Sequence, residues 1–143
     1  MQKYNHLFPT DYESILSKIN AIQPEKYSKT RNFLNGDITY LSPYISRGVI
    51  STKQLMDAVL KNGFTFLQSE KLIQELAWRD YYQRIWQVKK NQIWDDLKQA
   101  QPGFTHHEML NSLLTCDTGI QVIDEHINHL YQAGYLHNHI RMY

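Results

Sequence analysis

The sequence predicts an all-α, multi-helical protein, and two observations support this. Apolar residues recur every three or four positions along most of the chain, in stretches bounded by capping residues, proline and glycine. No stretch alternates convincingly between apolar and polar residues, and no β-hairpin signal is present. The 143 residues contain no repeat, linker or low-complexity tract, so we expect one domain over residues 1–143.

Two amphipathic helices are expected in the first quarter of the chain. The first begins at a capping box formed by Thr10 and Glu13, and its apolar stripe continues as far as Pro24. The second starts at Pro24 and carries Leu34 on its apolar side. Gly36 is placed to close this helix in the left-handed conformation.

A short helix and a longer one follow an irregular link at residues 37–41. Ser42 is expected to cap the short helix, with Pro43 at its first position. Ser51 is expected to cap the next helix, which ends at Gly63. The backbone of the link must find hydrogen-bond partners outside regular structure.

The longest helical pattern runs from about Ser69 to Lys90. At about 100° of rotation per residue, one narrow arc of this helix gathers a carboxylate, a guanidinium and three aromatic rings. These residues are Glu75, Trp78, Arg79, Tyr82 and Trp86. The opposite side is also poor in solvated residues, which predicts a central helix packed on several flanks. The spacing alone favours a buried ion pair between Glu75 and Arg79.

The last third of the chain predicts a weak helix, a strong helix and a final helical segment. The weak helix is expected at about residues 109–114, after a looser stretch. Asp117 or Thr118 is placed to cap the strong helix, and Gly134 to stop it. The final segment begins near Leu136 and has no stop signal, so we expect the natural fold to continue beyond the last residue.

Composition excludes several classes of protein. The formal net charge of +1 produces no global field that demands nucleic acid or membrane. The single Cys116 excludes a disulfide framework, and His126 and His129 have no carboxylate partners at ligand spacing, so no metal site is expected. Without a signal peptide or a long apolar run, a soluble cytoplasmic protein is expected. The 13% of aromatic residues fits a protein that stacks on flat ligands.

Four stretches in register carry a resemblance to a known family. They are Tyr27 with Arg31, residues 39–51 (TYLSPYISRGVIS), residues 75–82 (ELAWRDYY), and residues 118–142, which begin with Thr-Gly and end with LHNHIRM. In order, spacing and content they resemble the first half of the helical FAD-binding domain of the photolyase/cryptochrome family. The resemblance implies the N-terminal half of that domain, without the family's α/β antenna domain and second cofactor segment.

The resemblance also implies FAD as cofactor and names the residues that would hold it. Thr39, Leu41 and Ser42 match the positions at the flavin diphosphate, and hydroxyls with backbone N–H groups at a helix start suit an anion. Ser42 taken alone is equally well explained as a plain helix cap. Further cofactor contacts are implied for Tyr27, Arg79, Asn138 and Arg141.

The implied partner is damaged DNA that contains pyrimidine dimers, which photolyases take out of the duplex. Trp78 matches the platform on which the flipped bases stack, and Glu75 matches the carboxyl that bonds the dimer and steadies its radical anion. Met142 matches a side chain of the lesion pocket, and Arg31 would contact DNA phosphate. In its complete form the protein would act as a light-driven carbon–carbon lyase.

Two other functions stay open at this point. A cryptochrome-like light or redox sensor would use the same cofactor but act through protein partners. A helical interaction module would keep the family's core without its cofactor. Some positions depart from the family pattern, among them Tyr135 in place of its tryptophan and His139 in place of its arginine. A partial domain would also expose an apolar edge, which a homodimer could cover.

Overall fold

The computed structural model describes residues 7–96 and 98–142, with Met142 described in its backbone only. Within this part of the chain every regular element is a helix, so the all-α prediction is confirmed. The α-helices are α1 (Tyr12–Asn20), α2 (Pro24–Thr30), α3 (Ser42–Ser46), α4 (Thr52–Lys61), α5 (Phe66–Lys89), α6 (Asn111–Leu114) and α7 (Gln121–Ala133). Two 3-10 helices, η2 (Lys90–Trp94) and η3 (Ile140–Met142), complete the described elements.

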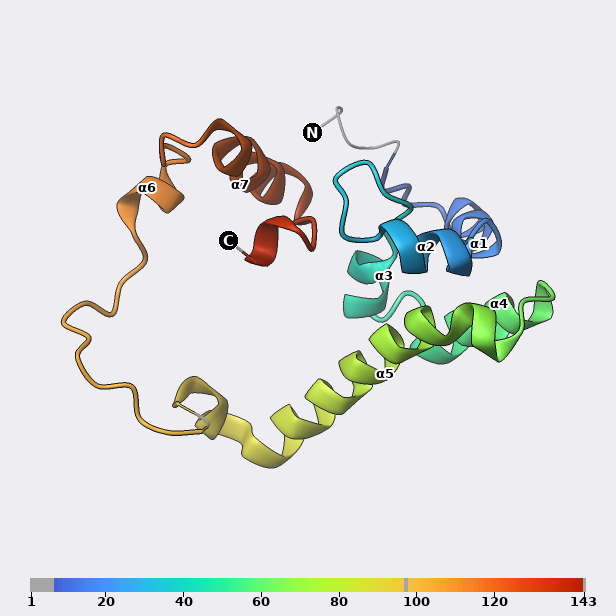
Figure 1. The fold of residues 1–143 in the computed structure, drawn as a ribbon, viewed down its shortest axis with the longest axis horizontal. Coiled ribbons are helices and arrows are strands. Elements are labelled where there is room, and N and C mark those ends of the chain that lie inside the picture. Colours follow the sequence, from blue (N-terminus) through green and yellow to red (C-terminus); the bar gives the residue numbers. More distant parts are fainter. Residues whose placement is uncertain (1–6, 97, 143) are drawn as a thin grey trace.

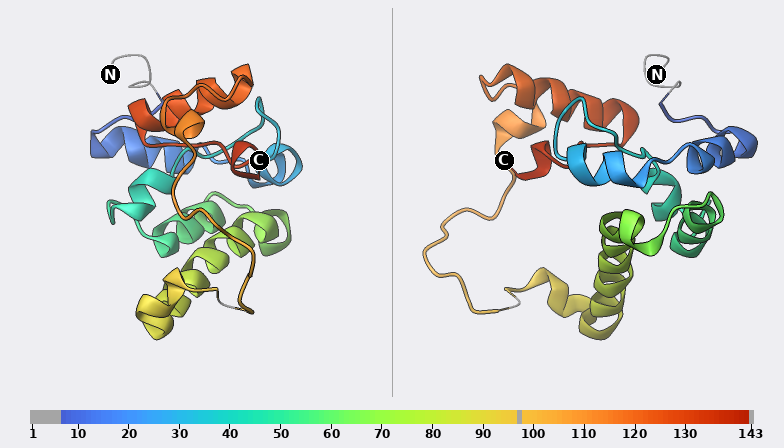
Figure 2. Two further views of the ribbon diagram at one scale, coloured as in Figure 1. Left: turned by 90° about the vertical axis from the view of Figure 1, so that its left-hand side faces the viewer. Right: turned by 45° about the vertical axis from the view of Figure 1, so that its right-hand side comes forward.

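Helices α1 to α4 and the start of α5 form a compact group at one side of an open, curled chain (Figure 1). α2 and α4 pack against α5, and α1 packs against α4. α5 then runs away from the group, and an irregular stretch between η2 and α6 leads back to α7 (Figures 1 and 2). The C-terminal segment after α7 therefore returns to face α2 and α3.

The core lies between α1, α3, α4 and the first half of α5. Its buried residues are Ile15, Ile19, Ile22, Leu41, Tyr44, Ile50, Leu55, Val59 and Leu72. Tyr44 is anchored in it by a hydrogen bond, since its hydroxyl donates to the carbonyl oxygen of Pro9 at 2.7 Å. This small core fixes α5 at one end only.

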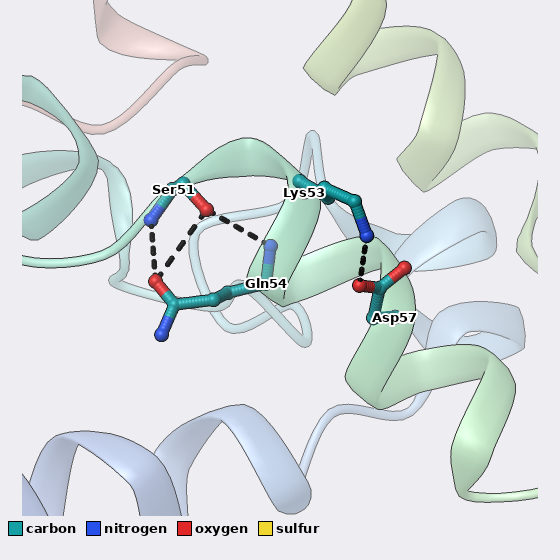
Figure 3. A network of polar contacts seen from close by, with 4 residues as sticks. All are labelled: Ser51, Lys53, Gln54 and Asp57. Carbon is teal, nitrogen blue, oxygen red and sulfur yellow. Dashed lines mark hydrogen bonds and ion pairs between the residues drawn. The ribbon is translucent and has the colours of Figure 1, made fainter.

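Capping boxes set the start of the two longest helices in this group. Ser51 caps α4 as predicted, and its side chain and that of Gln54 satisfy each other's backbone N–H groups (Figure 3). The same figure shows the ion pair between Lys53 and Asp57 one turn further on. Thr65 caps α5 in the same way, so α5 begins earlier than the predicted Ser69. The sequence interpretation had overlooked this second capping box.

The first two helices differ in detail from their predictions. Asp11, not Thr10, caps α1, because its carboxylate accepts the N–H of Ser14 at 2.8 Å. α2 ends at Thr30, so the predicted inclusion of Leu34 in this helix is wrong, and Gly36 does not adopt the left-handed conformation. A side chain at Gly36 would instead meet the carbonyl oxygen of Thr30, with a Cβ at only 1.8 Å. Glycine is required there by close approach of the backbone.

Helix α3 begins one residue earlier than the prediction, which had Ser42 as the cap and Pro43 as the first helical residue. Leu41 occupies the N-cap position and Ser42 is the first helical residue, with no side-chain cap.

The start of α7 also differs from expectation, while its end does not. Ile120 is the N-cap, and no side chain caps the helix. Thr118 instead donates its backbone N–H and its hydroxyl to Asp124, at 2.8 and 2.6 Å. Gly134 stops α7 in the left-handed conformation, as predicted, with a φ of 67°. The final segment, predicted from Leu136, forms only the short η3.

The second half of α5 is not packed on several flanks, and that prediction is wrong. Trp78, Tyr82 and Trp86 are 52%, 63% and 60% exposed. Within α5 the fully buried residues that the structure describes are Ser69 and Leu72, both near its start. An aromatic face is therefore presented to solvent.

Candidate functional site

A cavity of about 260 Å³ lies where α2, α5, the link before α3 and the C-terminal segment meet. Most of the residues predicted to form the site line this cavity. They are Tyr27, Arg31, Thr39, Ser42, Glu75, Arg79, Asn138 and Arg141. Some of these residues are more than a hundred positions apart in the sequence, and the fold brings their side chains to one cavity.

Helix α2 and its C-cap supply two of these side chains from one face. Tyr27 and Arg31 are four residues apart and hence adjacent on the helix surface. Arg31 lies opposite α5, where its guanidinium is 3.3 Å from the carboxylate of Glu75. Lys71, one turn before Glu75, lies 3.0 Å from the same carboxylate. Glu75 is thus held between two cations.

The ion pair between Glu75 and Arg79, which the spacing favoured, is not formed. Arg79 points instead towards α3, where its guanidinium donates to the hydroxyl of Ser46 at 3.3 Å. Glu75 is paired instead with Arg31, which follows α2 and lies 3.3 Å from its carboxylate. This frees the Arg79 guanidinium to line the cavity.

The link before α3 supplies hydroxyls and one ring. Thr39 and Ser42 line the cavity, as does Tyr40, whose φ of 53° is unusual for a residue other than glycine. Leu41, a predicted cofactor contact, has its side chain fully buried in the core. Its backbone N–H is directed to the hydroxyl oxygen of Thr39 at 3.3 Å. The hydroxyls, and not Leu41, therefore face the cavity.

An aromatic cluster that the sequence interpretation missed lies beside the cavity, and two of its three rings line it. Tyr40 and Tyr135 have ring centroids 5.3 Å apart, and Phe8 lies 5.8 and 5.4 Å from them. These contacts join the N-terminal segment, the link and the segment after α7. Since the three residues lie far apart in sequence, only the general excess of aromatic residues could have indicated such a cluster.

Burial raises the pKa of two tyrosine hydroxyls of the site. Burial, followed by the neighbouring Tyr40, raises the pKa of Tyr135 to about 12. Burial also raises the pKa of Tyr27, with the nearby Glu75 charge acting in the same direction. Both phenols are therefore neutral hydrogen-bonding groups at physiological pH.

The C-terminal segment brings two further predicted residues to the cavity. Asn138 donates a hydrogen bond to the side-chain oxygen of Asn32 at 3.2 Å, which links this segment to the turn after α2. Arg141, in η3, adds a third guanidinium to the cavity lining. Met142 was predicted to line the lesion pocket, and its side chain lies outside the described residues.

Trp78 does not line the cavity but a separate groove of about 650 Å³ on the exposed face of α5. Glu75 and Arg79 line both spaces, so the cavity and the groove adjoin along α5. Tyr82 and Trp86 extend the groove beyond Trp78. The predicted stacking residue and the predicted cofactor residues therefore face different but neighbouring spaces.

The donor set of the cavity fits part of an anionic cofactor with a flat ring system. Arg31, Arg79 and Arg141 are forked donors suited to phosphate, and hydroxyls stand beside them. Aromatic and aliphatic side chains supply apolar walls. A volume of about 260 Å³ lies just below the range of roughly 300–1,000 Å³ that is usual for sites holding a whole small molecule.

A family comparison decides the assignment. The model for the FAD-binding domain of DNA photolyase matches residues 72–143, which is half of the chain and includes most of α5, α7 and the C-terminal segment. The chain belongs to this photolyase FAD-binding domain family.

Curated relatives of the photolyase family match over most of this chain. The deoxyribodipyrimidine photo-lyase of Alkalihalophilus pseudofirmus is 28% identical over 71% of this chain and 22% of its own length. Those of Streptomyces griseus and Vibrio cholerae are each 25% identical, over 81% and 92% of this chain and 26% and 30% of their own lengths. The chain therefore spans less than a third of these relatives. No solved structure matches it at a significant level.

The residues that the structure describes include neither a candidate metal cluster nor a candidate membrane span. No group of three or more His, Cys, Asp or Glu side chains among them is arranged to hold a metal ion. None of the helices described is both long and apolar enough to cross a membrane.

Proposed function

We propose that this chain binds FAD in the cavity between α2, α5 and the C-terminal segment. The observation that supports this most strongly is the convergence of Tyr27, Thr39, Arg79 and Arg141 on one cavity, although they come from four distant parts of the sequence. The Arg79 and Arg141 guanidinium groups would bind the diphosphate, with the Thr39 and Ser42 hydroxyls beside it. Asn138 would contact the ring.

We further propose that the complete protein acts on DNA that contains pyrimidine dimers. When bound, reduced FAD supplies an electron on absorbing light. Trp78 would stack on the extruded bases in the groove, and Glu75 would hydrogen-bond to them at the border between groove and cavity. Arg31 lies in an ion pair with Glu75, so we assign it to orienting that carboxylate before any phosphate contact.

The first experiment is an absorbance spectrum of the purified chain before and after addition of excess FAD and desalting. We expect a retained flavin band. Arg79→Gln should lower the amount of retained flavin. Arg84→Gln is the control and should leave that amount unchanged, because Arg84 is an exposed residue of the same helix that lies outside the cavity. A chain that retains no flavin, or two variants that retain it equally, would contradict the proposed cavity.

A second experiment separates repair from light sensing. Flavin-loaded protein is illuminated with an oligonucleotide that carries a single pyrimidine dimer, and the restored bases are measured. Repair above that of an undamaged control supports the lyase function. Light-induced flavin changes that the lesion leaves unaffected would instead favour the cryptochrome-like sensor.

A further inference from the structure

The exposed half of α5 carries a continuous stripe of rings on one helix face. Trp78, Tyr82 and Trp86 are each four residues apart, so they lie within a narrow arc and about 6 Å apart along the axis. The rings of Trp78 and Tyr82 are nearly parallel, with an interplanar angle of 28° and centroids 5.9 Å apart. All three side chains are more than half exposed, and all three line the groove.

The charges around this stripe favour an anion. Arg79 lines the groove, and Lys89 falls on the same arc one turn beyond Trp86. Glu75 is the carboxylate on this arc, and it is already paired with two cations from outside the groove, Arg31 and Lys71. Residues 81–94 contain Arg84, Lys89 and Lys90 but no Asp or Glu.

Flat rings in a row with cations at their ends are the features by which proteins hold unpaired bases. Base–aromatic stacking accepts any base, and the cations follow the backbone phosphates. The groove of about 650 Å³ is larger than a small anionic ligand would fill. Three rings of Trp and Tyr are also not the surface expected for packing against an aliphatic partner helix.

We propose that the stripe formed by Trp78, Tyr82 and Trp86 binds unpaired, undamaged single-stranded DNA, with Lys89 contacting its phosphates. This binding requires neither flavin nor a lesion. It also uses Tyr82 and Trp86, whereas the proposed repair function uses only Trp78 of the three rings. In the complete protein, the stripe would hold the strand next to the extruded bases.

The test uses the full 143-residue chain without flavin, in the dark, and an unmodified oligothymidylate labelled with a fluorophore. Trp86→Ala should weaken binding by roughly fivefold or more, as expected for the loss of one stacked base. Trp94→Ala is the matched control, because Trp94 is 84% exposed in η2 but lies outside the groove. It should leave the affinity unchanged.

The salt dependence tests the phosphate contact separately. Lys89→Gln should lower the slope of log affinity against log salt by about 0.7, the value for one phosphate contact with a single strand. Arg84→Gln removes a charge from the opposite face of α5 and should leave the slope unchanged.

Several outcomes would overturn the proposal. The first is that the chain does not bind oligothymidylate, and the second is that Trp86→Ala and Trp94→Ala reduce the affinity equally. The third is that the chain self-associates, that Trp86→Ala abolishes this association, and that oligothymidylate does not compete with it. The last result would assign the stripe to a second copy of this chain. Loss of flavin retention in the earlier experiment would leave this test unaffected, so the two proposals fail separately.

Discussion

The guanidinium of Arg31 lies 3.3 Å from the carboxylate of Glu75, and this ion pair joins α2 to α5 beside the cavity. Both side chains are partly exposed, at 20% and 33%. Lys71 reaches the same carboxylate from within α5. The two cations therefore play different structural parts, because only one of them connects two helices.

Arg31→Met should destabilise the fold more than Lys71→Met. We expect a loss of about 1 kcal/mol for Arg31, at the upper end for partly exposed pairs, and about 0.3–0.5 kcal/mol for the pair within one helix. Urea unfolding followed by circular dichroism measures both. Equal losses would show that the contact between α2 and α5 does not depend on this ion pair.

Gly36→Ala should be among the most damaging single-methyl additions in this chain. Its Cβ would stand 1.8 Å from the backbone carbonyl of Thr30, so the turn after α2 would have to move. Overpacking costs about 1–3 kcal/mol, and more where backbone must shift. Gly119→Ala is the control, since its φ of +78° is strained but nothing lies within 4 Å. In thermal unfolding, the melting temperature of Gly36→Ala should be well below that of Gly119→Ala.

Stability should fall as the pH drops below about 6.5, in part because of His137. Its side chain is only 5% exposed, and burial, followed by the charges of His126, His139 and Arg141, lowers its pKa below 6.5. The unfolded chain then binds the proton more readily than the folded one, so the contribution is complete above pH 6.5 and decreases below it.

His137→Asn tests this contribution and keeps an acceptor near the Nδ1 position, which receives the N–H of His139 at 3.1 Å. The free energy of unfolding of the variant should depend less on pH below 6.5. Unfolding at fixed temperature across this range provides the measurement. Parallel pH profiles would assign the acid sensitivity to other histidines.

Trp78→Ala should weaken binding of a lesion-containing oligonucleotide while leaving flavin content nearly unchanged. Trp78 lines the groove and not the cavity, so the two ligands should respond separately. Loss of one stacked base corresponds to about 1–3 kcal/mol. Fluorescence anisotropy and flavin absorbance give the two readings, with Trp94→Ala as the exposed control. Unchanged affinity for the lesion would count against Trp78 as its platform.

The helical class and the ends of several helices could be predicted because they depend on local chemistry. Ser51 and Gly134 act within one turn of their own positions, so their roles as cap and stop are visible in sequence. The close approach of Gly36 to Thr30 is different, because it arises only when the chain turns back over α2. No local pattern contains that information.

In the candidate site, too, some features could be predicted from the sequence and others depend on tertiary packing. The motifs predicted that Tyr27, Arg79 and Arg141 belong together, and the structure brings them to one cavity. Helical spacing predicted an ion pair between Glu75 and Arg79, whereas in the structure Glu75 is paired with Arg31 from outside its own helix. The prediction failed where packing between helices overrode proximity within one helix.

The C-terminal wall of the cavity, residues 135–141, is attached to the rest of the molecule by few contacts between helices. Among the described elements, α7 has no extensive helix partner, and the segment after it is held by the contacts of Tyr135 with Phe8 and Tyr40. An irregular stretch, with described residues 98–110, connects it to the rest of the chain (Figure 2). Docking of this wall is therefore an intramolecular association, with an effective concentration set by the tether.

Any ligand that touches both walls must shift that association by mass action. Occupancy of the cavity and docking of residues 135–141 then form one thermodynamic cycle, so each strengthens the other by the same factor. Amide exchange in this segment would accordingly report ligand binding at the opposite wall.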